Sequence, residues 1–122
     1  MALLTPKVLG PNAGFTDLIA QLVAVTAGGD SFYLTGREIL VINNGNAATR
    51  TVTLSTVVAS APDNYGIVNA VHDITLAIPT TKIGIWGAFT IFRFRDGSGN
   101  AQLTYSVSAT VTIGVFAVGI TG

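Results

Sequence analysis

The fold is decided by residues 37–55, which read REILVINNGNAATRTVTLS. Four consecutive apolar residues at 39–42 are typical of a strand that is buried on both faces. The Asn-Asn-Gly-Asn sequence at 43–46 is a strong turn signal. From 51 to 55, apolar and polar residues alternate, which is typical of a half-buried strand. This stretch therefore predicts two strands joined by a tight turn.

The same two signals recur along the rest of the chain. Apolar residues alternate with polar ones at 72–78, 101–107 and 110–118, and a turn-forming Asp-Gly-Ser-Gly-Asn sequence stands at 96–100. Residues 15–25 fit either a helix or, in their second half, a strand. About eight strands with no repeating helix between them predict an all-β protein, an antiparallel β-sandwich. We expect it to be jelly-roll-like and not a seven-stranded immunoglobulin-like sandwich.

The length of 122 residues predicts one domain, at 15–122, preceded by an N-terminal arm at 1–14. The Gly-Pro-Asn-Ala-Gly sequence at 10–14 separates the two parts. The arm is apolar, and two alternatives stay open for it. It docks on a neighbouring subunit, or it forms a frayed terminus or an edge strand of its own domain.

Only 10% of the residues are charged and the net charge is zero, whereas about 25% is ordinary for a soluble domain. Such a surface is poorly protected against association, so we expect partner chains to cover part of it. The six basic residues are scattered, apart from Arg93 and Arg95, which would share one face of a strand. This distribution predicts no nucleic-acid binding.

Residues suited to catalysis are few. His72 is the single histidine, and it stands beside Asp73, but neighbours in a strand point to opposite faces. The chain has no cysteine, so thiolate metal sites and disulfides are absent. The turn at 96–100 is not followed by the acidic ligand of a calcium loop. We therefore expect no enzyme and no catalytic, cofactor or metal site.

Targeting signals are not visible either. Pro6, Lys7 and Gly10 interrupt the segment where a secretory signal would need an unbroken apolar core. No apolar run reaches the length of about 18 residues that predicts a membrane span. The sequence thus predicts no membrane association.

Aromatic residues gather in one place. Four of the ten in the chain, Trp86, Phe89, Phe92 and Phe94, lie within nine positions. Exposed rings in this cluster would suit a carbohydrate-binding platform. Core packing, or an anchor in a subunit interface, explains the cluster with fewer assumptions.

These segments together resemble the small capsid decoration, or cement, proteins of tailed bacteriophages. The resemblance spans about residues 30–118 and is carried by Arg-Glu-Ile-Leu-Val-Ile-Asn-Asn-Gly at 37–45 with Thr-Val-Thr-Leu at 51–54. The later segments 73–79 and 96–106 are similar in order and spacing. Family members typically have a proline beside the glycine at 87, where this chain has Ala88.

The resemblance implies a structural virion protein made in the host cytoplasm. Such a protein binds the major capsid protein on the outside of the shell, commonly as a trimer, and stabilises the shell by bridging capsid subunits. Other virion parts, such as tail or head-completion proteins, and a carbohydrate-binding module remain alternatives. The residues expected at the interfaces are Leu3, Leu4, Pro6, Val8, Trp86, Phe89 and Phe92.

Overall fold

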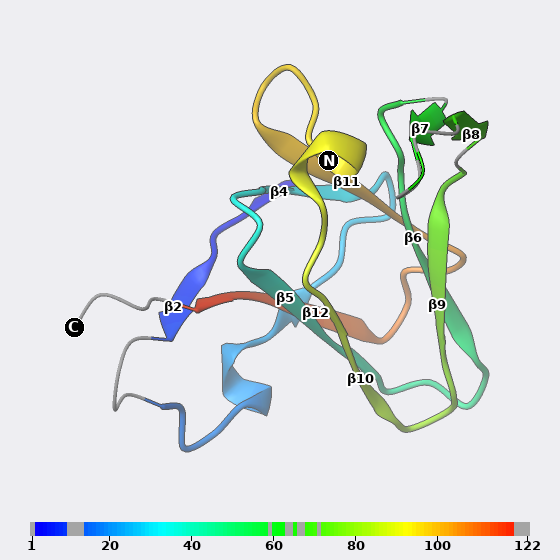
Figure 1. The fold of residues 1–122 in the computed structure, drawn as a ribbon. Coiled ribbons are helices and arrows are strands. Elements are labelled where there is room, and N and C mark those ends of the chain that lie inside the picture. The colour runs from blue at the N-terminus through cyan, green and yellow to red at the C-terminus, as the bar shows by residue number, and fades with distance from the viewer. Residues whose placement is uncertain are drawn as a thin grey trace.

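A computed structural model of the chain shows two packed β-sheets that form a sandwich (Figure 1). The predicted all-β sandwich is therefore confirmed. The structure describes residues 2–9, 14–58, 60–62, 65, 68–70 and 72–118. Residues 10–13, which hold most of the separator predicted at 10–14, lie outside the described part.

The first sheet, sheet A, has five strands. Three of them correspond to the segments at 51–55, 72–78 and 101–107 in which apolar and polar residues alternate. In spatial order the strands are β1 (Ala2–Leu4), β4 (Asp30–Tyr33), β11 (Asn100–Tyr105), β6 (Arg50–Leu54) and β9 (Ile74–Ile78).

The second sheet, sheet B, packs against sheet A. Its centre is the pair formed by β5 (Glu38–Asn44) and β12 (Val111–Val118). β3 (Val23–Ala24) and β2 (Lys7–Leu9) both pair with the other edge of β12. In spatial order its main strands are β10 (Ile83–Gly87), β5 (Glu38–Asn44), β12 (Val111–Val118) and β2 (Lys7–Leu9).

Shorter elements complete the described chain. A 3-10 helix, η1 (Ile19–Gln21), precedes β3, so residues 15–25 contain both the helical turn and the strand that the sequence allowed. The strands β7 (Ser60–Pro62) and β8 (Val68–Ala70) pair with each other. A single helical turn, α1 (Ile91–Phe94), follows β10.

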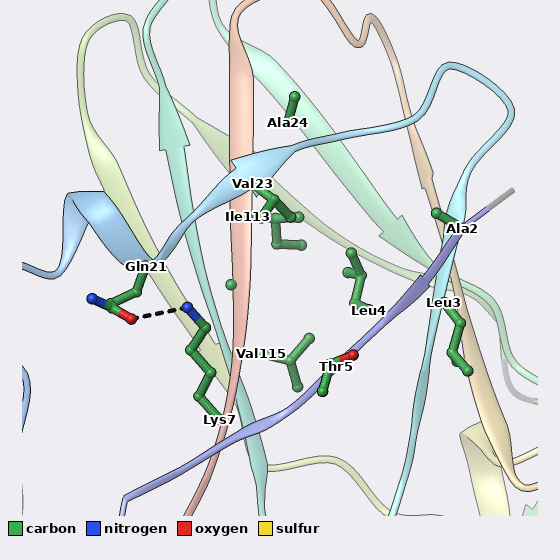
Figure 2. Close-up of a pocket in the computed structure, with 11 residues that line it drawn as sticks. Ala2, Leu3, Leu4, Thr5, Lys7, Gln21, Val23, Ala24, Ile113 and Val115 are labelled. Carbon is green, nitrogen blue, oxygen red and sulfur yellow. Dashed lines mark hydrogen bonds between the residues drawn. The ribbon is translucent and has the colours of Figure 1, made fainter.

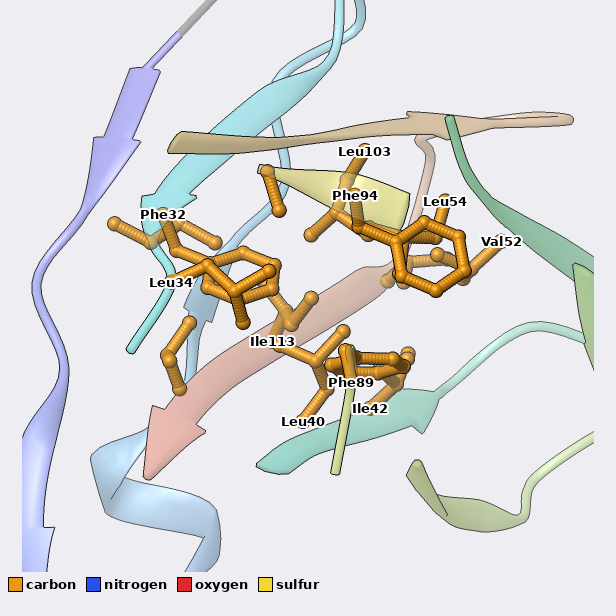
Figure 3. Close-up of a cluster of buried hydrophobic side chains, with 14 of the residues drawn as sticks. Phe32, Leu34, Leu40, Ile42, Val52, Leu54, Phe89, Phe94, Leu103 and Ile113 are labelled. Atoms are coloured by element: carbon orange, nitrogen blue, oxygen red, sulfur yellow. The ribbon is translucent and has the colours of Figure 1, made fainter. Parts of the chain in front are cut away.

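The hydrophobic core fills the space between the sheets, where side chains of both sheets point toward one another (Figure 3). Burying such side chains is the main favourable contribution to folding. The inward residues of β12, Val111, Ile113 and Val115, are among them, as their alternation predicted. The core consists of Leu4, Phe32, Leu34, Leu40, Ile42, Val52, Leu54, Ile78, Phe89, Phe94, Ala101, Leu103, Val111, Ile113 and Val115.

The N-terminal segment connects the two sheets. β1 pairs in parallel with β4 of sheet A, and β2 pairs in parallel with β12 of sheet B. All other strand pairs among the described residues are antiparallel. The sheets are therefore mixed, and within one chain residues 2–9 adopt the edge-strand alternative.

The turn after β5 is held by a buried amide. Asn44 is fully buried, and its Nδ2 donates hydrogen bonds to the carbonyl oxygens of Ala48 (2.8 Å), Ile78 (2.9 Å) and Pro79 (3.2 Å). Its Oδ1 accepts a hydrogen bond from the backbone N–H of Asn46 at 3.0 Å. One side chain thus joins the turn after β5 to the turn between β9 and β10.

β10 ends at Gly87, in a backbone conformation that favours glycine. Gly87 has φ +136°, and a Cβ atom at this position would lie 2.8 Å from the carbonyl oxygen of Glu38. The Gly87–Ala88 peptide bond is cis. Beyond it the chain leaves the sheet, and α1 places Phe94 in the core.

Candidate assembly surface

The interface residues predicted in the N-terminal segment lie in different environments. Leu3 and Val8 are 64% and 66% exposed, and Pro6 is half-buried. Leu4, by contrast, is 7% exposed and belongs to the core. In the single chain, Leu3 and Val8 are therefore free to contact a partner, whereas Leu4 anchors the segment to its own sandwich.

The three predicted aromatic interface residues are also divided. Phe89 is buried at the end of the core, with its ring 5.4 Å from Trp86, 6.1 Å from Phe94 and 6.2 Å from Phe32. Trp86 is half-buried against the core, and Phe92 is 61% exposed. Edge-to-face packing of this kind stabilises a core. Most of the cluster therefore packs internally and does not form a row of exposed rings.

A hollow of about 300 Å³ lies beneath the N-terminal segment, between β1 on one side and β3 and β12 on the other (Figure 2). Leu4, Val23 and Val115 contribute apolar walls. At one end, the Nζ of Lys7 donates a hydrogen bond of 2.9 Å to the Oε1 of Gln21. The segment thus closes this side of the sandwich without filling it.

The outer face of sheet B is apolar. Residues directly opposite in paired strands point to the same side of a sheet, and Leu40 and Trp86 point inward. The register therefore directs Ile83 and Ile85 outward, together with Val41. Ile39, Ile83 and Ile85 remain accessible on this side, and the two residues of β10 are 48% and 68% exposed.

We call this surface the sheet B face, meaning the outward residues of β10, β5 and β12. No charged residue occupies any of the outward positions of these three strands. They are Ile83, Ile85, Gly87, Ile39, Val41, Asn43, Thr112, Gly114 and Phe116.

Residues 15–22 cover the β12 side of the sheet B face. The ring of Phe15 packs edge-on against that of Phe116 at 5.4 Å. Leu22 lies so close to Gly114 that a Cβ there would be 2.8 Å from its Cδ2. Ile19, between these two contacts, stays 49% exposed. Phe15 and Ile19 of this segment therefore add exposed apolar surface beside the sheet B face, and the segment also carries the exposed Asp17.

The outer face of sheet A has a different character. Its central strands direct Thr53, Thr104 and Thr75 outward in one row across the sheet, and Thr51 and Gln102 lie beside them. Hydroxyl and amide groups keep such a face hydrated. The two faces of the sandwich are thus distinct, and the sheet B face is the one that favours burial against another surface.

Sequence reasoning did not find the sheet B face. The signal was present in the apolar run at 39–42, which predicted a strand covered on both faces. In the part of the chain that the structure describes, residues 15–22 cover the β12 side of the second face. The alternation of Ile83 and Ile85 with Gly84 marked a sheet face. It did not tell which side faced out.

His72 and Asp73, the residues considered for chemistry, both lie at the surface. His72 is exposed, and its carbonyl oxygen accepts a hydrogen bond from Arg93 Nη2 at 2.7 Å. Asp73 Oδ1 accepts one from the backbone N–H of Thr56 at 2.9 Å. Within the part of the chain that is described, no three His, Cys, Asp or Glu side chains are grouped to hold a metal ion.

The two arginines predicted on one strand face are placed differently, and that expectation was wrong. Arg93 is in α1 and stacks on the Phe94 ring at 5.0 Å, because the chain leaves the sheet after Gly87. Arg95 follows α1, stacks on the ring of Tyr33 at 5.1 Å and donates a hydrogen bond to its hydroxyl at 2.9 Å. Both cations are engaged within the chain.

Asp96 organises the turn at 96–100 through hydrogen bonds to its side chain. Its Oδ1 accepts hydrogen bonds from the backbone N–H groups of Ser98 (2.8 Å) and Asn100 (3.0 Å), and its Oδ2 accepts one from Gln102 (2.8 Å). The bond from Asn100, followed by that from Gln102, lowers the pKa of the Asp96 carboxyl. The predicted turn is confirmed.

One buried acid is paired with a phenol inside the sandwich. Asp30 is fully buried, and its Oδ2 accepts hydrogen bonds from the Tyr105 hydroxyl at 2.6 Å and from the backbone N–H of Thr26 at 3.1 Å. Burial, and then this bond to Asp30, raise the pKa of Tyr105. Glu38 is also buried and accepts hydrogen bonds from Thr35. Burying two acids leaves the surface with even fewer charges.

Comparison with known proteins finds no matching family model, no matching curated protein and no matching solved structure. No helix in the described ranges is long and apolar enough to cross a membrane.

Proposed function

We propose that the chain is a structural virion protein that binds the outside of a phage capsid and stabilises the shell by bridging capsid subunits. The observation that carries the proposal is the sheet B face, whose positions in β10, β5 and β12 carry no charge and leave Ile83 and Ile85 exposed, on a protein with few charges of any kind. A face of this kind gains free energy when a partner covers it. The family resemblance adds the capsid as the partner and the trimer as the expected homo-oligomer.

The size of the apolar surface favours repeated attachment. With about 200 Å² for a fully exposed large apolar side chain, Phe15, Ile19, Ile83 and Ile85 expose roughly 400 Å² of apolar surface at their fractional exposures. A standard interface buries about 800 Å² on each partner. One such contact is therefore weak, and an oligomer bound to a repetitive shell gains affinity from simultaneous contacts.

The rival functions lose support to different degrees. A carbohydrate-binding module needs a row of exposed rings, and the aromatic cluster at 86–94 instead directs Phe89 and Phe94 into the core. Another virion part, such as a tail or head-completion protein, would use the same apolar face. Position in the particle separates it from a decoration protein.

The proposal is tested by co-sedimentation with expanded capsids that lack this protein. Ile19→Lys places a charge on the covering segment of the sheet B face, and Thr104→Lys places the same charge on the outer face of sheet A. We expect the native chain to bind saturably. Ile19→Lys should weaken the binding about tenfold or more, and Thr104→Lys should leave it unchanged. A native chain that stays in the supernatant, or equal losses for the two variants, would overturn the proposal.

A further inference from the structure

Among the described residues, β10 is an edge strand of sheet B whose outer side no other strand covers. It pairs with β5 on one side, and no strand of the described chain pairs with its other side. Its sequence, Ile-Gly-Ile-Trp-Gly, contains no charge and no proline, the two features that normally protect an edge. The opposite edge of sheet B ends in strands of three and two residues, β2 and β3. Sheet B therefore has one long open edge.

The sequence of β10 complements itself when it is paired antiparallel about Ile85. Ile83 then lies opposite Gly87 of a second copy, and Gly84 lies opposite Trp86. Ile85 alone meets its own counterpart. Centring the pair on Gly84 instead leaves two glycines opposite each other, and centring it on Trp86 places two tryptophans opposite each other. In the register centred on Ile85, Trp86 of each copy covers Gly84 of the other, as aromatic residues do for glycines in edge strands. The two Ile85 side chains pack against each other.

We propose that β10 pairs antiparallel with β10 of a second copy of this chain across a two-fold axis at Ile85. The pairing joins the two copies of sheet B into one continuous sheet, because the partner strand satisfies the backbone groups of the open edge. Ile83 and Ile85 of both copies then lie side by side on one enlarged sheet B face. A trimer formed through another surface leaves β10 free, so this pair would link trimers.

The inference names a surface for the self-association that the proposed function includes. It rests on the proposed function only in assuming that copies of the chain meet. Shell binding and β10 pairing are read by different experiments. Ile19→Lys and co-sedimentation report on the first, and cross-linking of the purified chain in the absence of shells reports on the second. Either can fail while the other succeeds.

The test uses single cysteines, which are unambiguous because the native chain contains none. Residues directly opposite in an antiparallel pair have Cα atoms about 4.5 to 5.5 Å apart, within the range of a disulfide. Ile85→Cys therefore brings two thiols together. Ile83→Cys is the matched control, because it lies on the same strand and face but about 13 Å from its own counterpart, at four residues of strand rise.

We expect Ile85→Cys to form a disulfide-linked dimer under mild oxidation at least about tenfold faster than Ile83→Cys. Light scattering of the native chain should show a mass that rises with concentration, and Ile85→Lys should weaken this association about tenfold or more, since two lysines would face each other. Circular dichroism confirms that each variant is folded. Equal cross-linking of the two cysteine variants, no cross-linking of Ile85→Cys, or an association unaffected by Ile85→Lys would overturn the proposal.

Discussion

Leu3 and Leu4 are adjacent leucines for which the structure predicts very different losses of stability on the same substitution. Leu4 is 7% exposed and belongs to the core, whereas Leu3 is 64% exposed. Replacing a buried leucine by alanine costs about 2 to 5 kcal/mol. The hollow of about 300 Å³ beside Leu4 means that its packing is incomplete. The free energy of unfolding should therefore fall by about 2 to 3 kcal/mol in Leu4→Ala, near the lower end of the range.

Leu3→Ala should cost less than about 0.5 kcal/mol, because an exposed side chain loses little burial. The assay is urea unfolding followed by circular dichroism, with thermal melting as a second measurement. At about 4 °C for each kcal/mol in a domain of this size, the melting temperature of Leu4→Ala should fall by about 8 to 12 °C. Equal and small effects of the two substitutions would refute the reasoning, because residues 2–9 would then not dock on their own sandwich.

Three further predictions concern the interior and the turns. Asn44→Ala removes the bonds to three carbonyl oxygens, so the free energy of unfolding should fall by about 2 to 4 kcal/mol in a urea titration. The pKa of Tyr105 is raised in the folded state, so its contribution to stability is present below about pH 10 and is lost as the pH rises further. Tyr105→Phe should remove this part of the alkaline destabilisation, seen as a flatter dependence of the urea midpoint on pH above about 9. Gly29→Ala should cost more than about 2 kcal/mol and Gly97→Ala less than about 0.5, since a Cβ at Gly29 (φ +100°) would lie 2.5 Å from a backbone oxygen of β11 and one at Gly97 meets nothing within 4 Å. Their thermal melts should rank accordingly, and equal melts would contradict the backbone argument.

The strands that the sequence predicted well are those in which a period of two is visible locally. The alternations at 51–55, 72–78 and 101–107 correspond to β6, β9 and β11. The alternation is a property of neighbouring residues and needs no knowledge of the partner strand. The Asn-Asn-Gly-Asn turn was found for the same reason, although its buried amide contacts with residues 78 and 79 were not.

Features that depend on distant contacts were not predictable in the same way. β1 and β2 are three residues long, and their assignment as strands depends on β4 and β12, which are far away in the chain. The residues of α1, Ile-Phe-Arg-Phe, have a composition typical of a strand, and the helical turn follows from the break at Gly87 and the burial of Phe94.

The candidate surface illustrates the same limit. The sequence placed Leu4 and Phe89 at interfaces because apolar residues in an arm or a cluster suit both a core and an interface. Burial separates these uses, and it puts both residues in the core of the chain. Ile83 and Ile85 have an ordinary strand pattern, and only the register with β5 directs them outward.

The central claim is that the protein stabilises a shell by covering it with this apolar face. The most direct measurement is the melting temperature of expanded capsids titrated with the purified chain in a calorimeter. The account predicts a rise in shell melting temperature that saturates at the same ratio of chain to capsid protein as binding does, and a smaller rise with Ile19→Lys than with Thr104→Lys. A shell that melts at the same temperature with and without the bound chain would contradict it.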